Sequence, residues 1–270
     1  MQLAALAFLL LTVSFLIIWV KKDVNVWAPL LGMSIFLGFL NGNILWFGLL
    51  TLVATFFLWR DYAKKPTTPL MILLAILTIL LKLRGIPGFV PIEMTAKWKI
   101  GFSGSISCFL PLAFIVPLAK TAADWKQVGK ALTYGILGIL LLAVIAITFR
   151  AVPFDLKFFP LLPLKLWSNL ILVSIPEEGF YRGFLQRDLA RLFERLKFPK
   201  SSILSLFLTT IIFTAAHLFW VPNYTVLGFV FLAGLLYGWV YLKTEKIESA
   251  IGTHFLLNAA HMIFFSYHAI

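Results

Sequence analysis

Long apolar runs, separated by short polar or basic stretches, follow one another from end to end of this chain. Ten of these runs are candidate membrane spans, at about residues 3–20, 25–41, 44–59, 68–82, 99–119, 131–149, 166–185, 203–221, 225–242 and 250–268. A helix needs about 20 apolar residues to cross a bilayer, so the run at 68–82 is short for a full crossing. The pattern predicts an all-α fold, a polytopic transmembrane helical bundle of about 8–10 spans.

The composition also favours lipid as the main solvent. Hydrophobic residues make up 61% of the 270 residues and charged residues only 13%, whereas soluble domains are roughly half apolar and a quarter charged. The net charge is +12, but the basic residues punctuate the apolar runs instead of clustering on one soluble face. We therefore expect membrane lipids as partners and no nucleic acid. The short loops and modest length favour a multi-pass protein of the bacterial inner (plasma) membrane.

The single cysteine, Cys108, lies within an apolar run. One cysteine excludes a disulfide framework and a cysteine-based zinc site within the chain. Cys108 is expected to be a small buried packing residue, with a catalytic thiol as the alternative.

Residues 186–200 carry alternating apolar and basic positions. Their sequence is QRDLARLFERLKFPK, in which leucine and phenylalanine recur at helical spacing with arginines between them. This pattern is typical of an amphipathic helix at an anionic membrane surface. A cytoplasmic extension of the preceding span is the alternative.

Two adjacent glutamates and an arginine interrupt the run at 166–185. An ionisable group near the bilayer centre costs roughly 2.5–3.5 kcal/mol on insertion scales, which makes it a candidate for function. Glu178 and Arg182 are four residues apart on one helical face and can form an ion pair. Glu177 is rotated by about 100° and has no partner on its own helix, so it is a candidate general base for water. The alternative is an ion-paired cluster that only fixes helix packing.

Two histidines and an asparagine occupy later apolar runs. His217 follows two alanines late in the run at 203–221, where an interhelical hydrogen bond is the alternative to catalysis. His254 and Asn258 are four residues apart and share a helical face, and both can donate hydrogen bonds to an oxyanion. If the two helices run parallel from the same level, His217 and His254 differ in depth by roughly 15 Å.

Together these motifs resemble the signature of the CPBP family of intramembrane proteases. That family includes the type II CAAX prenyl endopeptidases (Ras-converting enzyme) and the bacterial Abi proteins. Its pattern of EExxxR, FxxxH and HxxxN is matched at residues 177–182, 213–217 and 254–258. The resemblance covers about residues 165–270 and predicts a catalytic transmembrane core there. Residues 1–164 carry no recognised motif and are predicted to be N-terminal transmembrane helices.

The resemblance implies an intramembrane endopeptidase that hydrolyses a peptide bond of a membrane-associated peptide or protein. Glu177 together with His217 would activate a water molecule. His254 and Asn258 would stabilise the tetrahedral oxyanion.

The same resemblance implies supporting roles and leaves metal dependence open. Glu178 and Arg182 would orient the site. Family members have been described as metal-independent glutamate proteases and as metalloproteases. We favour the metal-independent reaction with no cofactor. Zinc held by Glu177, His217 and His254 is the alternative.

Two other classes of function remain compatible with the residues. A non-enzymatic membrane scaffold or bacteriocin-immunity-type protein could keep the polar cluster for packing or partner binding. A proton-coupled transporter could use buried glutamate and histidine as a relay, although the chain shows no internal repeat. The sequence names neither the substrate nor the cleavage site.

Overall fold

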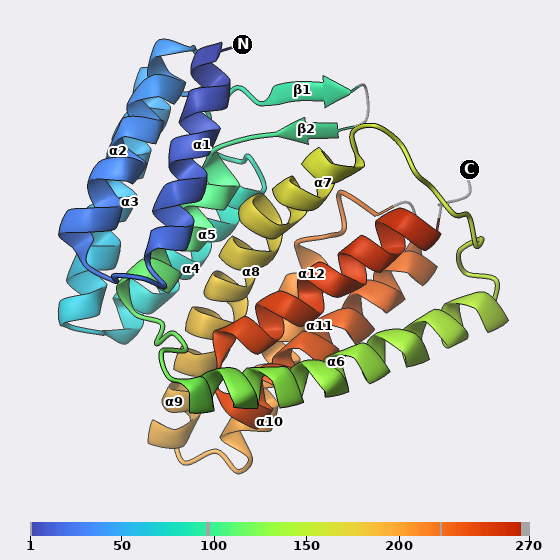
Figure 1. Ribbon diagram of the computed structural model, residues 1–270. Coiled ribbons are helices and arrows are strands. Elements are labelled where there is room, and N and C mark those ends of the chain that lie inside the picture. The colour runs from blue at the N-terminus through green and yellow to red at the C-terminus, as the bar shows by residue number, and fades with distance from the viewer. Residues whose placement is uncertain (1, 96–97, 222, 266–270) are drawn as a thin grey trace. The chain divides into compact units, whose positions relative to one another are not determined.

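The computed structural model describes residues 2–95, 98–221 and 223–265, and most of them are helical (Figure 1). The prediction of a mostly helical fold is confirmed, with one small sheet as the exception. The chain forms two compact units, one made of Met1–Val116 and Ile171–Phe180 and the other of Pro117–Leu170 and Tyr181–Ile270.

The first unit contains six α-helices and a two-stranded sheet in its described residues. They are α1 (Gln2–Ile17), α2 (Val24–Leu40), α3 (Trp46–Lys64), α4 (Thr68–Lys82), β1 (Ile92–Thr95), β2 (Trp98–Ile100), α5 (Ser103–Phe114) and α8 (Ile175–Phe180). The two strands are antiparallel, with Ile92 opposite Ile100. The apolar run at 99–119 therefore does not form one span-length helix, because its first residues belong to β2.

Helix α5 lies at the centre of the first unit and is buried along most of its length. Its Phe109 stacks on Phe15 of α1 at 3.9 Å between ring centroids. The ring of Trp27 in α2 meets Phe109 and Phe114 edge-on, at 5.9 and 5.1 Å. Aromatic packing of this kind contributes beyond simple area burial. It fixes α1 and α2 against the helix that also contacts α8.

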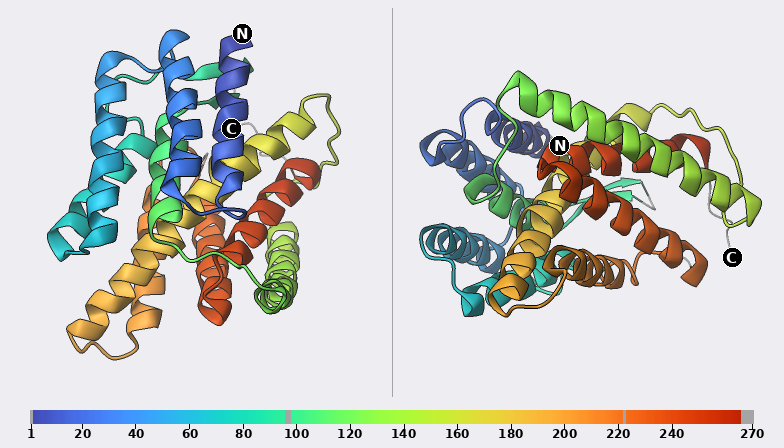
Figure 2. Two further views of the ribbon diagram at one scale, coloured as in Figure 1. Left: turned by 60° about the vertical axis from the view of Figure 1, so that its left-hand side comes forward. Right: turned by 90° about the horizontal axis from the view of Figure 1, so that it is seen from below.

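The second unit contains seven further helices in its described residues. They are α6 (Ala122–Thr148), α7 (Leu162–Ser168), η2 (Tyr181–Gln186), α9 (Arg187–Arg195), α10 (Ser201–Ala215), α11 (Tyr224–Thr244) and α12 (Ile247–Phe264). Helices α6, α11 and α12 are neighbours in both views of Figure 2. Glycines of α6 permit this close packing, because a Cβ at Gly135 would lie 2.3 Å from Thr253 of α12 and one at Gly138 would lie 2.4 Å from Leu236 of α11.

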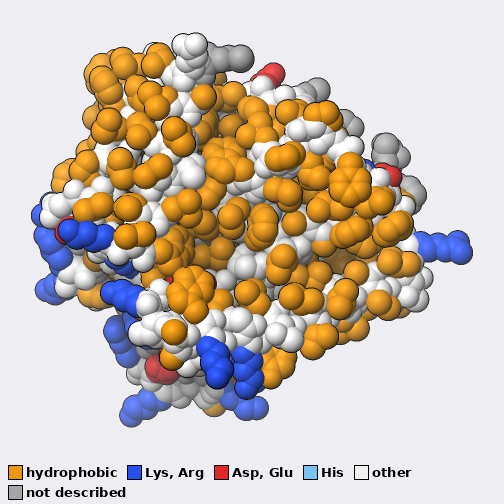
Figure 3. Space-filling view, viewed as in Figure 1, with side chains coloured by type: hydrophobic (Ala, Val, Ile, Leu, Met, Phe, Trp, Pro, Cys, Tyr) orange, Lys and Arg blue, Asp and Glu red, His pale blue; other side chains and the backbone are white. Residues whose placement is uncertain are grey.

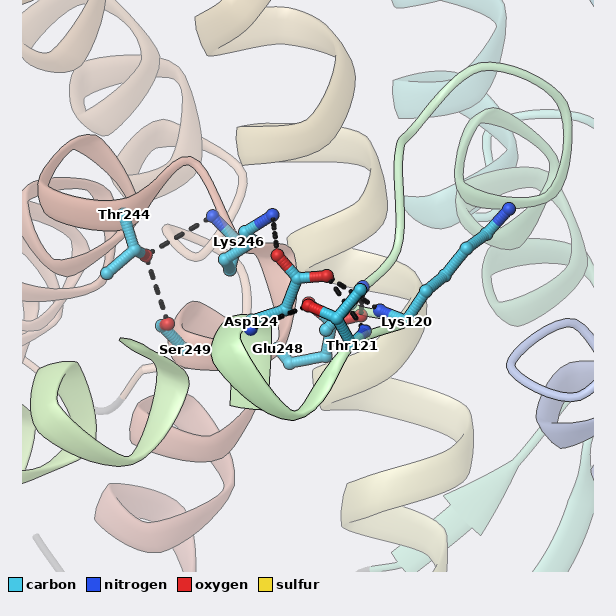
Figure 4. Close-up of polar contacts among 8 residues, drawn as sticks. Lys120, Thr121, Asp124, Thr244, Lys246, Glu248 and Ser249 are labelled. Atoms are coloured by element: carbon cyan, nitrogen blue, oxygen red, sulfur yellow. Dashed lines mark hydrogen bonds and ion pairs between the residues drawn. The ribbon is translucent and has the colours of Figure 1, made fainter. Parts of the chain in front are cut away.

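Polar contacts at the start of α6 join it to the connection between α11 and α12 (Figure 4). Thr121 and Asp124 form a capping box at the N-terminus of α6. The Asp124 carboxylate also forms an ion pair with Lys246, with 2.6 Å between Oδ1 and Nζ. Glu248 accepts a hydrogen bond from the backbone N–H of Ala119 at 2.8 Å. The chain before α6 is thus fastened to the first turn of α12.

By length and composition, two helices among the described residues could cross a membrane. They are α6, with 27 residues and a mean hydropathy of 2.4, and α11, with 21 residues and a mean hydropathy of 1.9. Apolar side chains cover most of the face drawn in Figure 3. Four large residues of α6 are more than half exposed, namely Leu137, Leu140, Leu141 and Val144. Such a surface suits lipid better than water. The expected 8–10 spans remain a prediction.

Several helix ends differ from the expected ones. The helix expected at 131–149 begins earlier, at Ala122, because the capping box adds two polar turns. The helix expected at 203–221 ends at Ala215. The run at 250–268 extends beyond the described residues, which end at 265.

Candidate active site

The two glutamates lie in α8, which has a π-helix on each side along the chain. These π-helices are η1 (Asn169–Ser174) and η2. Such segments are rare and often occur at functional sites. Glu178 is completely buried. The next residue, Gly179, meets α5 so closely that a Cβ there would lie 2.8 Å from the Cβ of Leu112. The absence of a side chain at Gly179 therefore sets how near α8 comes to α5.

Glu177 has a charged partner from a distant part of the same unit. The ammonium group of Lys82, at the end of α4, donates a hydrogen bond to Oε1 of Glu177 and forms an ion pair with it. The two side chains are only 11% and 13% exposed. The sequence indicated that Glu177 had no partner on its own helix, and the partner in the structure is 95 residues away along the chain.

In the second unit, Arg182 of η2 is buried against α10 and α11. Its guanidinium donates a hydrogen bond to the backbone oxygen of Gly234 at 2.8 Å. The guanidinium carbon lies 4.8 Å from the ring centroid of Phe213 and 5.5 Å from that of Tyr237. Aromatic faces favour a cation at this distance. The positive charge is therefore partly stabilised by the surrounding rings.

A second hydrogen bond repeats this arrangement one helical turn later. Gln186 donates to the backbone oxygen of Gly238 at 3.1 Å. A Cβ at Gly234 would lie 3.1 Å from Phe213, and one at Gly238 would lie 2.7 Å from Gln186. The two glycines thus open the α11 backbone to the side chains of η2.

His254 of α12 is buried between two aromatic rings of the same unit. Its ring stacks on Tyr237 with 4.6 Å between centroids and 12° between planes. It meets Phe213 edge-on at 6.2 Å. These contacts fix the orientation of the imidazole, as a hydrogen-bond donor for a developing charge requires.

His217 lies two residues beyond the end of α10, and its ring is also beside Phe213. The two ring centroids are 4.4 Å apart. Its Nδ1 is 2.7 Å from the backbone oxygen of Phe213. Since His217 and His254 both contact Phe213, the depth difference of roughly 15 Å inferred from level, parallel helices is wrong. The two assumptions behind it, parallel helices and a common starting level, therefore do not both hold.

Asn258 is positioned by another asparagine of the second unit. Its Nδ2 donates a hydrogen bond to Oδ1 of Asn169 at 2.9 Å. Asn169 in turn donates to the backbone oxygen of Phe255 at 3.4 Å. Asn169 is a polar residue within an apolar run, and that signal alone could have marked it in the sequence.

The structure therefore gathers the expected residues in two groups. Glu177 and Glu178 lie in the first unit with Lys82. The other expected residues, all in the second unit, are Arg182, His217, His254 and Asn258, and the first three of these contact Phe213. The expected ion pair of Glu178 with Arg182 joins residues of different units and stays a prediction.

Four further residues contact these groups and were not predicted as site residues. They are Lys82, Asn169, Phe213 and Tyr237. Phe213 opens the FxxxH motif, so its position was visible in the sequence. Tyr237 lies between Gly234 and Gly238, where an aromatic residue carries no signal of its own.

The described residues contain no preformed set of ligands for a resident metal ion. Over residues 2–95, 98–221 and 223–265, no three histidine, cysteine, aspartate or glutamate side chains are grouped so that they could hold one. In addition, Lys82 already places a cation on Glu177, one of the three expected zinc ligands.

The segment that contains the expected site residues resembles a known protein family. Residues 159–260 match the family model described as Rce1-like, type II CAAX prenyl endopeptidase Rce1-like. This segment of the chain is similar to the Rce1-like family. The family is an integral membrane one, and the resemblance inferred from the three motifs is confirmed. All six expected site residues lie in the Rce1-like segment, whereas Lys82 lies outside it. Searches of curated proteins and of solved structures gave no match.

Proposed function

We propose that this chain is an intramembrane endopeptidase that cleaves a membrane-associated peptide or protein by glutamate-activated water. The Rce1-like family indicates a protease whose substrates are membrane-associated. The observation that carries the proposal is the grouping of Arg182, His217 and His254 around Phe213, inside the segment that matches the family. A multi-pass protein of the bacterial inner membrane is the setting we propose for it.

The first chemical step is the activation of water. Glu177, assisted by His217, takes a proton from a water molecule as the water oxygen forms a bond to the carbonyl carbon of the substrate. The electron pair of the carbonyl moves onto its oxygen. The product of this step is a tetrahedral intermediate and a protonated base.

The second step is the breakdown of that intermediate. The carbonyl forms again, the C–N bond breaks, and the proton held by the base passes to the departing amine. One water is consumed, and a carboxylate and an amine are released. His254 and Asn258 donate hydrogen bonds to the oxyanion between the two steps, and such donors typically contribute 10²–10³-fold in rate. Glu178 and Arg182 keep the site in position.

The test uses the purified protein in liposomes with two defined probes. One is a fluorescence-quenched peptide that ends in a farnesylated CAAX sequence, and the other is the same peptide without the farnesyl group. Glu177→Gln should abolish cleavage of whichever probe the wild type cleaves. Glu93→Gln, at a surface ion pair of β1, is the matched control and should leave the rate unchanged. Cleavage by Glu177→Gln at the wild-type rate would remove Glu177 as the base.

The metal-dependent form of the same reaction makes a different prediction. It requires stoichiometric zinc in the purified protein and loss of activity in a chelator, with recovery when zinc is returned. The metal-independent reaction that we propose keeps its rate after chelation. Metal analysis of wild type and His217→Ala by emission spectroscopy separates the two.

A further inference from the structure

Lys82 and Glu177 form an ion pair that the family motifs do not contain. Lys82 is the last residue of α4 and lies outside the matched segment, whereas Glu177 belongs to the first motif. The ammonium donates to Oε1 of the carboxylate, and both side chains are about one tenth exposed. The N-terminal part of the chain thus supplies a charge to the residue proposed as the base.

The packing of the first unit brings these two residues together by way of α5. A Cβ at Gly104 of α5 would lie 3.2 Å from the Cα of Lys82, so the missing side chain lets the end of α4 approach. On α8, Gly179 allows the equally close approach of Leu112. Ser105 of α5 donates a hydrogen bond to the backbone oxygen of Leu172 at 2.9 Å, which ties the chain before α8 to the same helix.

A carboxylate in an apolar environment requires a partner to remain ionised and in one place. Transfer of an isolated charge from water into such an environment costs several kcal/mol or more. The ammonium of Lys82 offsets this cost and holds one oxygen of Glu177 by a charge-assisted hydrogen bond. A carboxylate has about four lone-pair sites, and one ammonium hydrogen bond uses one of them.

We propose that Lys82 is a positioning residue for the reaction, which holds the Glu177 carboxylate in the orientation that activates water. This inference rests on the proposed role of Glu177 as the base. Helices α4 and α5 then have a role in the reaction, because they hold the Lys82 ammonium beside the Glu177 carboxylate.

The test compares Lys82→Met and Lys82→Arg with the wild type on the probe peptide that the wild type cleaves faster. Lys82→Met should lower kcat at least tenfold with KM unchanged, since Lys82 acts through its contact with the base. Lys82→Arg retains the positive charge and should recover most of the rate. If Lys82→Met fails to fold, Lys82→Gln replaces it, with the same expected loss.

The matched control is Lys99→Met. Lys99 forms the same kind of lysine–glutamate pair with Glu93, but on the exposed strands β1 and β2. Its removal should change neither kcat nor KM. Equal losses for Lys99→Met and Lys82→Met would show a general effect of charge and overturn the proposal.

A second measurement separates this proposal from the proposed function. The melting temperature of Lys82→Met should fall, and that of Lys82→Met with Glu177→Gln should recover, because the double variant removes both charges of the ion pair. If Glu177→Gln is inactive while Lys82→Met keeps the full rate, the positioning role fails and the proposed function stands. If Glu177→Gln is fully active, Glu177 is not the base, and both proposals fail.

Discussion

The side-chain amide of Asn258 donates a hydrogen bond to Asn169, a residue 89 positions earlier in the chain, over 2.9 Å. Asn258 comes from α12, and Asn169 is the first residue of the π-helix η1. The bond fixes the rotation of the Asn258 amide. If Asn258 donates to the oxyanion, Asn169 determines where that donor points.

Replacement of Asn169 should therefore lower the rate of peptide cleavage, because the Asn258 amide loses the hydrogen bond that orients it. A net hydrogen bond of this kind contributes about 1 kcal/mol, so Asn169→Ala should reduce kcat about fivefold. Asn258→Ala should cost more, roughly 10²-fold or above. The double variant should be no slower than Asn258→Ala alone, since Asn169 acts only through that residue. Additive losses in peptide cleavage assays would contradict this.

The stacking of Tyr237 on His254 provides a second prediction. An aromatic pair contributes about 0.5–1.5 kcal/mol beyond its buried area. Tyr237→Leu should therefore lower kcat by roughly 2- to 10-fold as the imidazole loses its fixed orientation. Tyr237→Phe keeps the ring and should lose less. Steady-state rates on the same probe peptide measure both, and equal losses would count against a role for the stack.

Because α8 approaches α5 closely at Gly179, one added carbon at this position should strongly lower the stability of the protein. Gly179→Ala places a Cβ 2.8 Å from Leu112 and should destabilise the protein by about 1–3 kcal/mol. Gly129 of α6 has no atom within 4 Å of its added Cβ. Gly129→Ala should be neutral or stabilise the helix by about 0.5–1 kcal/mol. Thermal unfolding in detergent, followed by circular dichroism, should show opposite shifts for the two variants.

The contacts of Asp124 predict how stability depends on pH. Asp124 lies in the first turn of α6, ahead of the apolar run at 131–149. The hydrogen bond from Lys246 and those from the backbone of Thr121 and Lys120 hold the pKa of this carboxyl well below its ordinary value of 3.8. A lowered folded-state pKa stabilises the fold above the unfolded value, and this contribution is lost as the pH falls below about 4.

Asp124→Asn should remove that part of the acid dependence. Melting temperatures measured between neutral pH and about pH 3 should fall less steeply for the variant than for the wild type. The variant should also be less stable at neutral pH, because the bond to Lys246 loses its charge. An unchanged acid slope would mean that Asp124 does not contribute.

The sequence identified the candidate catalytic residues, but it identified fewer of the residues that contact them. Glu177, His217 and His254 stood out because a polar group within an apolar run is costly and therefore rare. Phe213 and Asn169 were visible by the same logic, one as part of a motif and one as a polar residue in a span. Lys82 resembled any basic residue at the end of an apolar run, so nothing local marked it as the partner of Glu177.

The helices themselves followed from the periodicity of apolar residues, but several of their ends did not. The capping box of Thr121 and Asp124 lengthened α6 at its start, and the turn at His217 shortened the helix expected to reach residue 221. The antiparallel strands β1 and β2 replaced the start of an expected span. Each of these changes depends on hydrogen bonds that periodicity does not report.

The sequence by itself determined that the chain is mostly helical, that lipid suits its surface, and that three ordered motifs mark a CAAX-endopeptidase-like segment. These properties are local, since they depend on residue type and on spacing of three or four positions. Only the tertiary structure decided that Lys82 holds Glu177, that Asn169 holds Asn258, and that Phe213 contacts Arg182 and both histidines. Apart from Phe213 and His217, these pairs lie far apart in sequence, and helix packing, through glycines such as Gly104, Gly179 and Gly234, brings them into contact.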